Sequence, residues 1–160
     1  MQDFFEYLNK SIDINDEAKA FISSVIKIRE FKKGDILITQ GQSKALDNYF
    51  VFSGFLRSYI IDNDGKEHTV QFAIKDWWIS DYIAYYGKGE AMLSVECLSD
   101  CIVLQSDKIS IEKVFEKFPH IETFHRKNLE KSFVRLNKRI MNQLQLNARD
   151  RYFNFINDFP

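Results

Sequence analysis

All six glycines of this 160-residue chain lie at or before Gly89, whereas its two prolines are Pro119 and Pro160. Glycine and proline are the residues that most often interrupt helices and form turns. The first half of the chain is therefore divided into short elements, and the second half can form long helices. This division predicts an α+β fold in which strands come first and long helices follow.

The composition indicates a folded chain. Apolar residues make up 45% of the chain and aromatic residues 15%, which is enough for a hydrophobic core. The N-terminal segment carries acidic residues and has no uninterrupted apolar stretch, so it does not resemble a signal peptide. No segment approaches the roughly 18 apolar residues that a membrane-spanning helix needs. We therefore expect a cytoplasmic protein with no membrane partner.

The net charge of −1 hides a basic segment in the second half of the chain. Between Arg126 and Arg151 there are eight basic residues and two acidic ones, Glu130 and Asp150. A basic helix can face nucleic acid, but it is more often a solvated face. Because the chain as a whole is not basic, we do not expect it to bind DNA by itself.

Short elements are predicted up to about residue 80. Helices are expected over residues 2–9 and 15–26, and Asn15 or Asp16 can cap the second one. The next residues are rich in Val, Ile, Phe and Tyr and predict strands, with a hairpin turn at residues 62–65. In the strand after this turn, the expected buried face consists of Val70, Phe72 and Ile74.

Further elements are predicted before the long helix. A short helix is expected over residues 81–86, and strands are expected over residues 93–98 and 101–105. Ser106 or Asp107 can then cap a helix that continues through Phe115.

A long helix is predicted from about residue 121 to residue 147, after Pro119. Its apolar residues recur at spacings of 4, 3, 4 and 4, and they are Leu129, Phe133, Leu136, Ile140 and Leu144. A globular helix averages about 11–12 residues, so a helix of this length usually packs against a partner. We expect these five residues to form a coiled-coil-like homodimer interface. The alternative is a helix that lies on its own β-domain. A second amphipathic helix is predicted after residue 148.

Three motifs occur in a fixed order. Phe31, Gly34, Asp35, Leu37 and Gly41 form the pattern F-x-x-G-D-x-L-x-x-x-G, and YFVFSGFLR and DNDGKE follow it. In this order the motifs resemble the cyclic-nucleotide-binding fold of Crp/Fnr transcription regulators. The resemblance implies a double-stranded β-helix, that is, a jelly-roll-like β-roll. It also implies N-terminal helices, a short cassette helix and a long C-terminal dimerisation helix.

The resemblance also implies a division into domains. It places a β-roll sensor domain at residues 1–118 and the dimerisation helix at residues 119–147. Residues 148–160 resemble the start of a DNA-binding domain whose helix-turn-helix is missing. DNA is then expected to be bound only through a C-terminal module that is absent from this chain.

The cassette differs from that of the cyclic-AMP-binding members of the family. Those members carry roughly Phe-Gly-Glu-Leu and then Arg-Ser or Arg-Thr, and the arginine neutralises the cyclic phosphate. Here the corresponding residues are WISDY at 78–82 and Ala91-Met92, and no arginine lies between Lys88 and Glu96. A charge-assisted hydrogen bond is worth about 1.5–3 kcal/mol, and Lys88 would replace arginine only as a point charge. Cyclic AMP is therefore not the expected effector.

Aromatic and polar side chains are expected to line the cassette instead. Rings with polar tips suit a small apolar or planar effector of unknown identity, oriented by Ser80 and Asp81. The candidate ligand-binding residues are Trp78, Ser80, Asp81, Tyr82, Tyr85, Ala91 and Met92. The alternative is a protein-interaction or structural dimer domain whose rings plug the pocket. Asp81 is in that case a helix N-cap.

No catalytic site or metal site is predicted. Cys97 and Cys101 are interpreted as buried structural thiols, because two cysteines without further ligands cannot complete a tetrahedral metal site. The three histidines are too dispersed to form a ligand set, and the sequence has no nucleophile elbow and no P-loop. We therefore expect no cofactor, no metal and no enzymatic activity.

Overall fold

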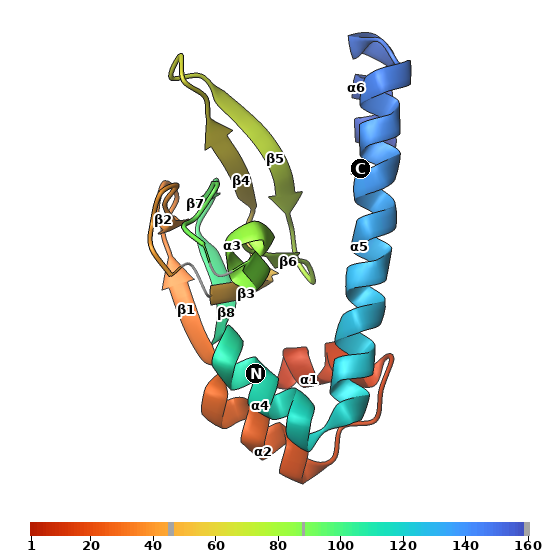
Figure 1. The fold of residues 1–160 in the computed structure, drawn as a ribbon. Helices are drawn as coiled ribbons and strands as arrows, with labels where there is room; N and C mark the ends of the chain where they lie inside the picture. Colours follow the sequence, from red (N-terminus) through yellow and green to blue (C-terminus); the bar gives the residue numbers. More distant parts are fainter. Residues whose placement is uncertain (45–46, 88, 159–160) are drawn as a thin grey trace. The chain divides into compact units, whose positions relative to one another are not determined.

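A computed structural model of the chain describes residues 1–44, 47–87 and 89–158. The chain divides into two compact units, Met1–Pro119 and His120–Pro160. The strands lie in the first unit, and the second unit is helical (Figure 1).

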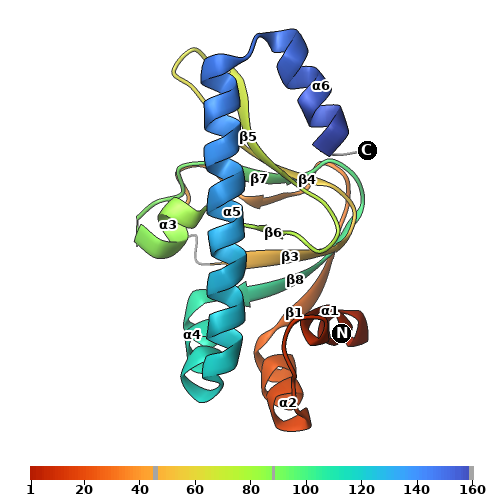
Figure 2. The same cartoon turned by 90° about the vertical axis from the view of Figure 1, so that its right-hand side faces the viewer.

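Within the described residues, the first unit contains two antiparallel sheets of four strands each (Figures 1 and 2). Sheet A consists, in spatial order, of β1 (Lys27–Phe31), β8 (Cys101–Asp107), β3 (Asp47–Ser53) and β6 (Trp78–Ile79). Sheet B consists of β2 (Ile36–Ile38), β7 (Ser94–Cys97), β4 (Leu56–Ile61) and β5 (Glu67–Ala73). Most neighbouring strands are far apart in the sequence, as in a jelly roll. The predicted fold class is therefore confirmed.

The hydrophobic core lies between the two sheets. Val51 of β3 and Val103 of β8 contribute to it from sheet A, and Leu56 of β4 and Val95 of β7 contribute from sheet B. All four side chains are completely buried. Burying a Val or Leu side chain stabilises a fold by roughly 1.5–3 kcal/mol, so this inner layer holds the two sheets together.

The inner face of β5 differs from the prediction. Ala73 is completely buried in the core, whereas Phe72 stacks on Phe55 outside it, with 5.4 Å between the ring centroids. Ile74 lies beyond the end of the strand and is exposed. The prediction that Val70, Phe72 and Ile74 form the buried face is therefore wrong. Apolar residues lie on both faces of β5, so alternation identified the strand but not its orientation.

Two helices precede β1, and they are α1 (Gln2–Asn9) and α2 (Asp16–Val25). The side chain of Asn15 caps α2 by accepting a hydrogen bond from the backbone N–H of Ala18 at 2.9 Å, which confirms the predicted cap. The ring of Phe4 in α1 packs against Phe50 of β3, with 5.0 Å between the centroids. Helix α1 therefore covers the outer face of sheet A.

Two further helices belong to the first unit, and they are α3 (Tyr82–Gly87), between β6 and β7, and α4 (Lys108–Lys117), after β8. The side chain of Asp107 caps α4, because it accepts a hydrogen bond from the backbone N–H of Ser110 at 2.9 Å. Of the two predicted capping residues for this helix, Asp107 is the one that forms the cap.

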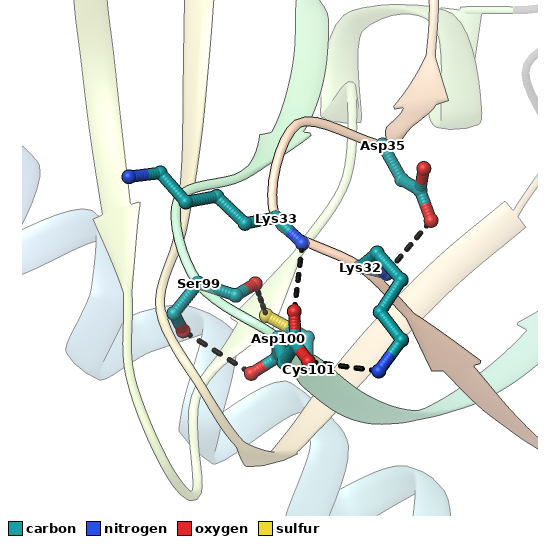
Figure 3. A network of polar contacts seen from close by, with 6 residues as sticks. All are labelled: Lys32, Lys33, Asp35, Ser99, Asp100 and Cys101. Carbon is teal, nitrogen blue, oxygen red and sulfur yellow. Dashed lines mark hydrogen bonds and ion pairs between the residues drawn. The ribbon is translucent and has the colours of Figure 1, made fainter.

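Three turns of the β-roll meet at one end of β7, and Figure 3 shows the polar contacts between two of them. Asp100, between β7 and β8, accepts hydrogen bonds from Nζ of Lys32 (2.8 Å) and from the backbone N–H of Lys33 (3.0 Å), both after β1. Gly54, between β3 and β4, has a φ angle of +96°. A Cβ atom at this position would lie 2.5 Å from the carbonyl oxygen of Asp100 and 2.5 Å from Sγ of Cys101. Only glycine fits between these turns.

The second unit contains most of α5 (Pro119–Gln145) and all of α6 (Ala148–Asp158). Pro119 is the first residue of α5, as predicted. Asn147 accepts a hydrogen bond from the backbone N–H of Asp150 at 3.0 Å, and this cap starts α6. The last two residues of the predicted segment 148–160 lie outside the described residues. No helix in the described ranges is both long enough and apolar enough to cross a membrane.

Candidate functional site

The connection from β6 to β7 forms the candidate ligand site. It begins with residues 80 and 81, continues through α3, and returns to β7 through residues 91–93. We refer to residues 80–93 as the cassette, of which residue 88 is not described. The cassette contains six of the seven predicted ligand-binding residues, and these are Ser80, Asp81, Tyr82, Tyr85, Ala91 and Met92.

The carboxylate of Asp81 joins the two ends of the cassette. Its Oδ1 atom accepts hydrogen bonds from the backbone N–H groups of Ile83 (3.0 Å) and Ala84 (3.1 Å) at the start of α3. Its Oδ2 atom accepts hydrogen bonds from the backbone N–H groups of Met92 and Leu93, just before β7. Asp81 is 0% exposed, so these four donors replace the water that a carboxylate needs. Asp81 is therefore a helix N-cap and also a link from α3 to β7.

The ends of the cassette are also hydrogen-bonded to β3 and to the loop after β2. The hydroxyl of Ser80 donates a hydrogen bond to the carbonyl oxygen of Asp47 at 2.7 Å, which fixes the first end to β3. The backbone N–H of Ala91 donates to the carbonyl oxygen of Gln42 (2.9 Å), and the N–H of Gly41 donates to the carbonyl oxygen of Ala91 (2.7 Å). Residues 91–93 are therefore held on one side by the loop after β2 and on the other by Asp81.

Three tyrosines of α3 contact one another. The centroids of Tyr82 and Tyr85 are 6.4 Å apart, and those of Tyr85 and Tyr86 are 5.0 Å apart in an edge-on arrangement. Nζ of Lys108, in α4, lies 5.6 Å from the centroid of Tyr86 and 5.9 Å from that of Tyr85. Burial raises the pKa of all three hydroxyls, so they stay neutral. These rings pack against one another and against a lysine of the same chain.

Trp78 lies apart from the other six predicted residues. Its ring packs against Phe50, with 5.1 Å between centroids, and against Phe4, with 6.3 Å, on the outer face of sheet A. The neighbouring residue Trp77 packs against the core instead. Trp77 directly precedes β6, and adjacent residues of extended chain point to opposite sides, but the sequence does not show which of the two tryptophans points inwards. Lys88, the possible substitute for the missing arginine, lies outside the described residues.

Sequence reasoning missed two of the groups that surround the cassette. The carbonyl oxygen of Gln42, in the loop after β2, accepts a hydrogen bond from Ala91. Lys108 contacts the tyrosines of α3 from α4, which follows α3 in the chain after the strands β7 and β8. Neither contact has a local signal in the sequence, because each joins segments that the fold alone brings together. Gly41 was identified as a motif residue, and its φ angle of +83° explains why glycine is needed there.

The two cysteines are free thiols and are buried in the core. Burial raises the pKa of the Cys97 thiol to about 12, so this thiol stays protonated at neutral pH. A protonated thiol is a poor nucleophile and a poor metal ligand. Within the ranges that the structure describes, no group of three or more His, Cys, Asp or Glu residues could hold a metal ion.

The apolar residues predicted to form the dimer interface lie on α5. Leu129 is half-buried, and the other four are exposed, from 44% for Ile140 to 82% for Leu144. Val134 and Met141 of the same helix are also exposed. An apolar surface of this kind on a helix is typical of an interface.

Comparison with known proteins gives one family and one fold. Residues 28–118 match the cyclic nucleotide-binding domain family. No curated protein matches the chain significantly.

Solved structures with the same fold include three named regulators. CLP, a c-di-GMP-responsive global regulator of Xanthomonas campestris, has a TM-score of 0.72 and 13% identity, over 90% of this chain and 72% of CLP. The catabolite activator protein of Thermus thermophilus has a TM-score of 0.59 and 17% identity, over 78% of this chain and 59% of that protein. A CooA variant from Carboxydothermus hydrogenoformans has a TM-score of 0.64 and 21% identity, over 89% of both chains.

Proposed function

Because the chain belongs to the cyclic nucleotide-binding domain family, we propose that it is the effector-sensing and dimerising part of a Crp/Fnr-type transcription regulator. Its effector is a small molecule other than cyclic AMP. DNA is bound by a C-terminal module outside this chain. Such a regulator acts on the chromosome, which places it in the cytoplasm, and its role is regulatory rather than enzymatic.

The exposed apolar side chains of α5 carry this proposal. The helix has 27 residues and follows directly after the segment that matches the family. Phe133, Leu136, Ile140 and Leu144 lie on one side of it, at spacings that suit pairing with an identical helix. Pairing removes these side chains from water, and each Å² of apolar surface buried contributes about 25 cal/mol. A homodimer is therefore the expected state of the chain.

The cassette supports an effector that differs from cyclic AMP. A cyclic nucleotide carries a negative phosphate, and the described part of the cassette contains no arginine to neutralise it. Ile83, Tyr86 and Met92 expose apolar surface there, which suits an uncharged ligand better than an anionic one.

A second candidate function is a structural or protein-interaction dimer domain without an effector. The packing of the three α3 tyrosines against one another and against Lys108 favours it. These side chains already contact groups of the same chain, so they are not needed to contact an effector. In this case the chain dimerises through α5 but binds no metabolite. Calorimetry against cyclic AMP, cyclic GMP and a metabolite panel separates the two candidates, since only the sensor gives saturable heat with a compound of the panel.

Dimerisation is tested with a matched pair of variants in α5. Phe133→Glu puts a charge on the proposed interface, and Asn142→Glu puts the same side chain nine residues further on, which at 3.6 residues per turn is about 180° around the helix. In sedimentation equilibrium, we expect a dimer for the wild-type chain and for Asn142→Glu, and a monomer for Phe133→Glu. A wild-type monomer, or a Phe133→Glu dimer of unchanged affinity, would contradict the proposal.

A further inference from the structure

The side chain of Gln40, in the loop after β2, extends the pairing of sheet B past the end of β7. Strand β7 pairs with β4 over Leu56–Tyr59, so Ile61 lies beyond the paired segment. There Oε1 of Gln40 accepts a hydrogen bond from the backbone N–H of Ile61 (2.8 Å), and Nε2 donates to the carbonyl oxygen of Ile61 (3.3 Å). A side-chain amide offers an acceptor and donors side by side, as the main chain does. Gln40 therefore pairs with the end of β4 as a neighbouring strand would.

The backbone of the same loop is hydrogen-bonded to the end of the cassette and to β7. The N–H of Gly41 donates to the carbonyl oxygen of Ala91 (2.7 Å), and the N–H of Ala91 donates to the carbonyl oxygen of Gln42 (2.9 Å). The N–H of Gln40 donates to Oγ of Ser94 at 3.0 Å. Three consecutive residues of the loop are therefore bonded to the cassette and to the β4–β5 hairpin.

The loop is also closed by hydrogen bonds of its own. The N–H of Gln42 donates to the carbonyl oxygen of Thr39 (2.9 Å), and the N–H of Thr39 donates to Oε1 of Gln42 (3.1 Å). A turn held by two reciprocal hydrogen bonds shifts as one unit more readily than it bends, because bending breaks them. A displacement of Ala91 therefore reaches the side chain of Gln40.

The end of the hairpin is well placed to respond. Residues 63–69 are exposed, and the hairpin extends past the other strands of sheet B (Figure 1). Across the turn, the backbone N–H of Asp62 donates to the carbonyl oxygen of Lys66 at 3.0 Å. Hydrogen bonds in exposed segments open at low free energy. The bond of Asp62 is therefore sensitive to a loss of pairing at the neighbouring Ile61.

We propose that Gln40 couples the cassette to the end of the β4–β5 hairpin, so that a ligand that moves residues 91–93 also changes how firmly the hairpin end is held. This proposal rests on the proposed function, because it concerns the response of the same site to its effector. It goes further by naming a part of the β-roll that responds to the cassette and by assigning the coupling to one side chain. Gln40 acts through the loop and is thus a positioning residue.

The first test combines two variants and follows amide hydrogen exchange at Asp62. Asp81→Asn disturbs the cassette, because an amide has fewer acceptor sites than a carboxylate for the N–H groups that Asp81 binds. Gln40→Met keeps the side-chain length but cannot pair with Ile61. We expect Asp81→Asn to speed exchange at Asp62 at least about fivefold, and less than about twofold when Gln40→Met is already present. If Gln40 were only structural, the two effects would multiply in the double variant, and that result, or no effect of Asp81→Asn, would overturn the proposal.

The matched control removes a glutamine amide from sheet A. Oε1 of Gln105 accepts a hydrogen bond from Nε of Arg29 on the neighbouring strand at 3.1 Å. Gln105→Met therefore makes the same substitution at a cross-strand contact outside sheet B. In this background Asp81→Asn should still speed exchange at Asp62 at least about fivefold. Loss of the effect in the control would overturn the assignment to Gln40.

The second test works in the opposite direction, and it decides the matter if Gln40→Met alone leaves the Asp62 amide unprotected. Coupling between two sites is reciprocal. Asp62→Ala loosens the hairpin end, because Oδ1 of Asp62 accepts hydrogen bonds from the N–H groups of Asp64 (3.0 Å) and Lys66 (2.9 Å). We expect this variant to speed exchange of the Ala91 amide at least about fivefold, and less than about twofold with Gln40→Met. An equal response in both backgrounds, or none in either, would overturn the proposal. Neither test needs an effector, so the result is separate from the calorimetry and sedimentation that test the proposed function.

Discussion

The Oδ2 atom of Asp81 accepts a hydrogen bond from the backbone N–H of Met92, eleven positions further along the chain. This bond closes the cassette into a loop that contains the whole of α3. The other carboxylate oxygen caps the same helix. One buried side chain therefore fixes both the start of α3 and the return of the chain to β7.

Asp81→Ala should destabilise the fold. The substitution leaves four backbone N–H groups without their acceptor, and a buried unpaired donor costs about 1–3 kcal/mol. Because Met92 is exposed and water can reach part of the cassette, we expect the free energy of unfolding to fall by at least about 2 kcal/mol. Urea denaturation measures this change. Asp64→Ala, in the exposed turn between β4 and β5, should stay within about 0.5 kcal/mol of the wild-type chain, and equal effects would disprove the role of Asp81.

Gly54 and Gly34 form a natural pair for testing the junction of the three turns. Both have positive φ angles, +96° and +91°, so alanine at either position costs about 1–2 kcal/mol of backbone strain. Only at Gly54 would the new Cβ collide with neighbouring atoms. We expect Gly54→Ala to lower the free energy of unfolding by at least about 1–3 kcal/mol more than Gly34→Ala.

The same collision predicts that shortening the side chain of Cys101 does not restore the stability lost in Gly54→Ala. Two of the atoms nearest to the new Cβ are backbone atoms, the carbonyl oxygen of Asp100 and Cα of Cys101. Shortening the side chain by Cys101→Ala removes the sulfur but not these atoms. The double variant Gly54→Ala/Cys101→Ala should therefore remain less stable than Cys101→Ala alone. If urea denaturation gave the two chains equal stabilities, the collision with backbone atoms would not be the cause of the stability lost in Gly54→Ala.

The order of the elements was predictable from the sequence because turn residues and apolar periodicity are local signals. Glycine spacing located the turns of the β-roll, and Pro119 located the start of α5. Where both faces of a strand carry apolar residues, the local signal fails. This is why Phe72 was predicted to be buried and Ala73 was not, and why Trp78 was grouped with the cassette although its ring packs with Phe50.

The candidate site was predictable only in part. Asp81 was identified as a possible cap because a carboxylate before a helix has a known local role. Its hydrogen bonds from Met92 and Leu93 depend on the path that the chain takes from α3 back to β7. The hydrogen bonds between Ala91 and the loop of Gly41 and Gln42 depend on the pairing of β2 with β7 in sheet B. Such contacts are set by tertiary structure, so a single sequence does not contain a direct signal for them.

The thiols of Cys97 and Cys101 should react only after the fold opens. Both are buried, and the pKa of Cys97 is raised by burial to about 12, which leaves very little thiolate at pH 8. An unfolded cysteine has a pKa near 8.5 and reacts readily. With a chromogenic disulfide reagent at pH 8, we expect labelling in native buffer to be at least about 100-fold slower than in concentrated urea. Similar rates in the two solvents would show that the thiols are accessible in the native chain.

Asp107 should make part of the stability depend on pH. Burial alone would raise the pKa of its carboxyl, but hydrogen bonds from the hydroxyl and backbone N–H of Ser110 outweigh this effect, and the pKa is lowered. A lowered pKa in the folded chain stabilises the fold at pH values above the unfolded pKa of about 3.9, and the contribution is lost as the pH falls through the folded pKa.

Asp107→Asn keeps an acceptor for the cap but does not titrate. The difference in free energy of unfolding between the wild-type chain and Asp107→Asn should therefore be largest near neutral pH and shrink below about pH 4. Urea denaturation of both chains across this range measures the difference, and a difference that did not change with pH would show that the Asp107 carboxylate gains nothing from the folded state.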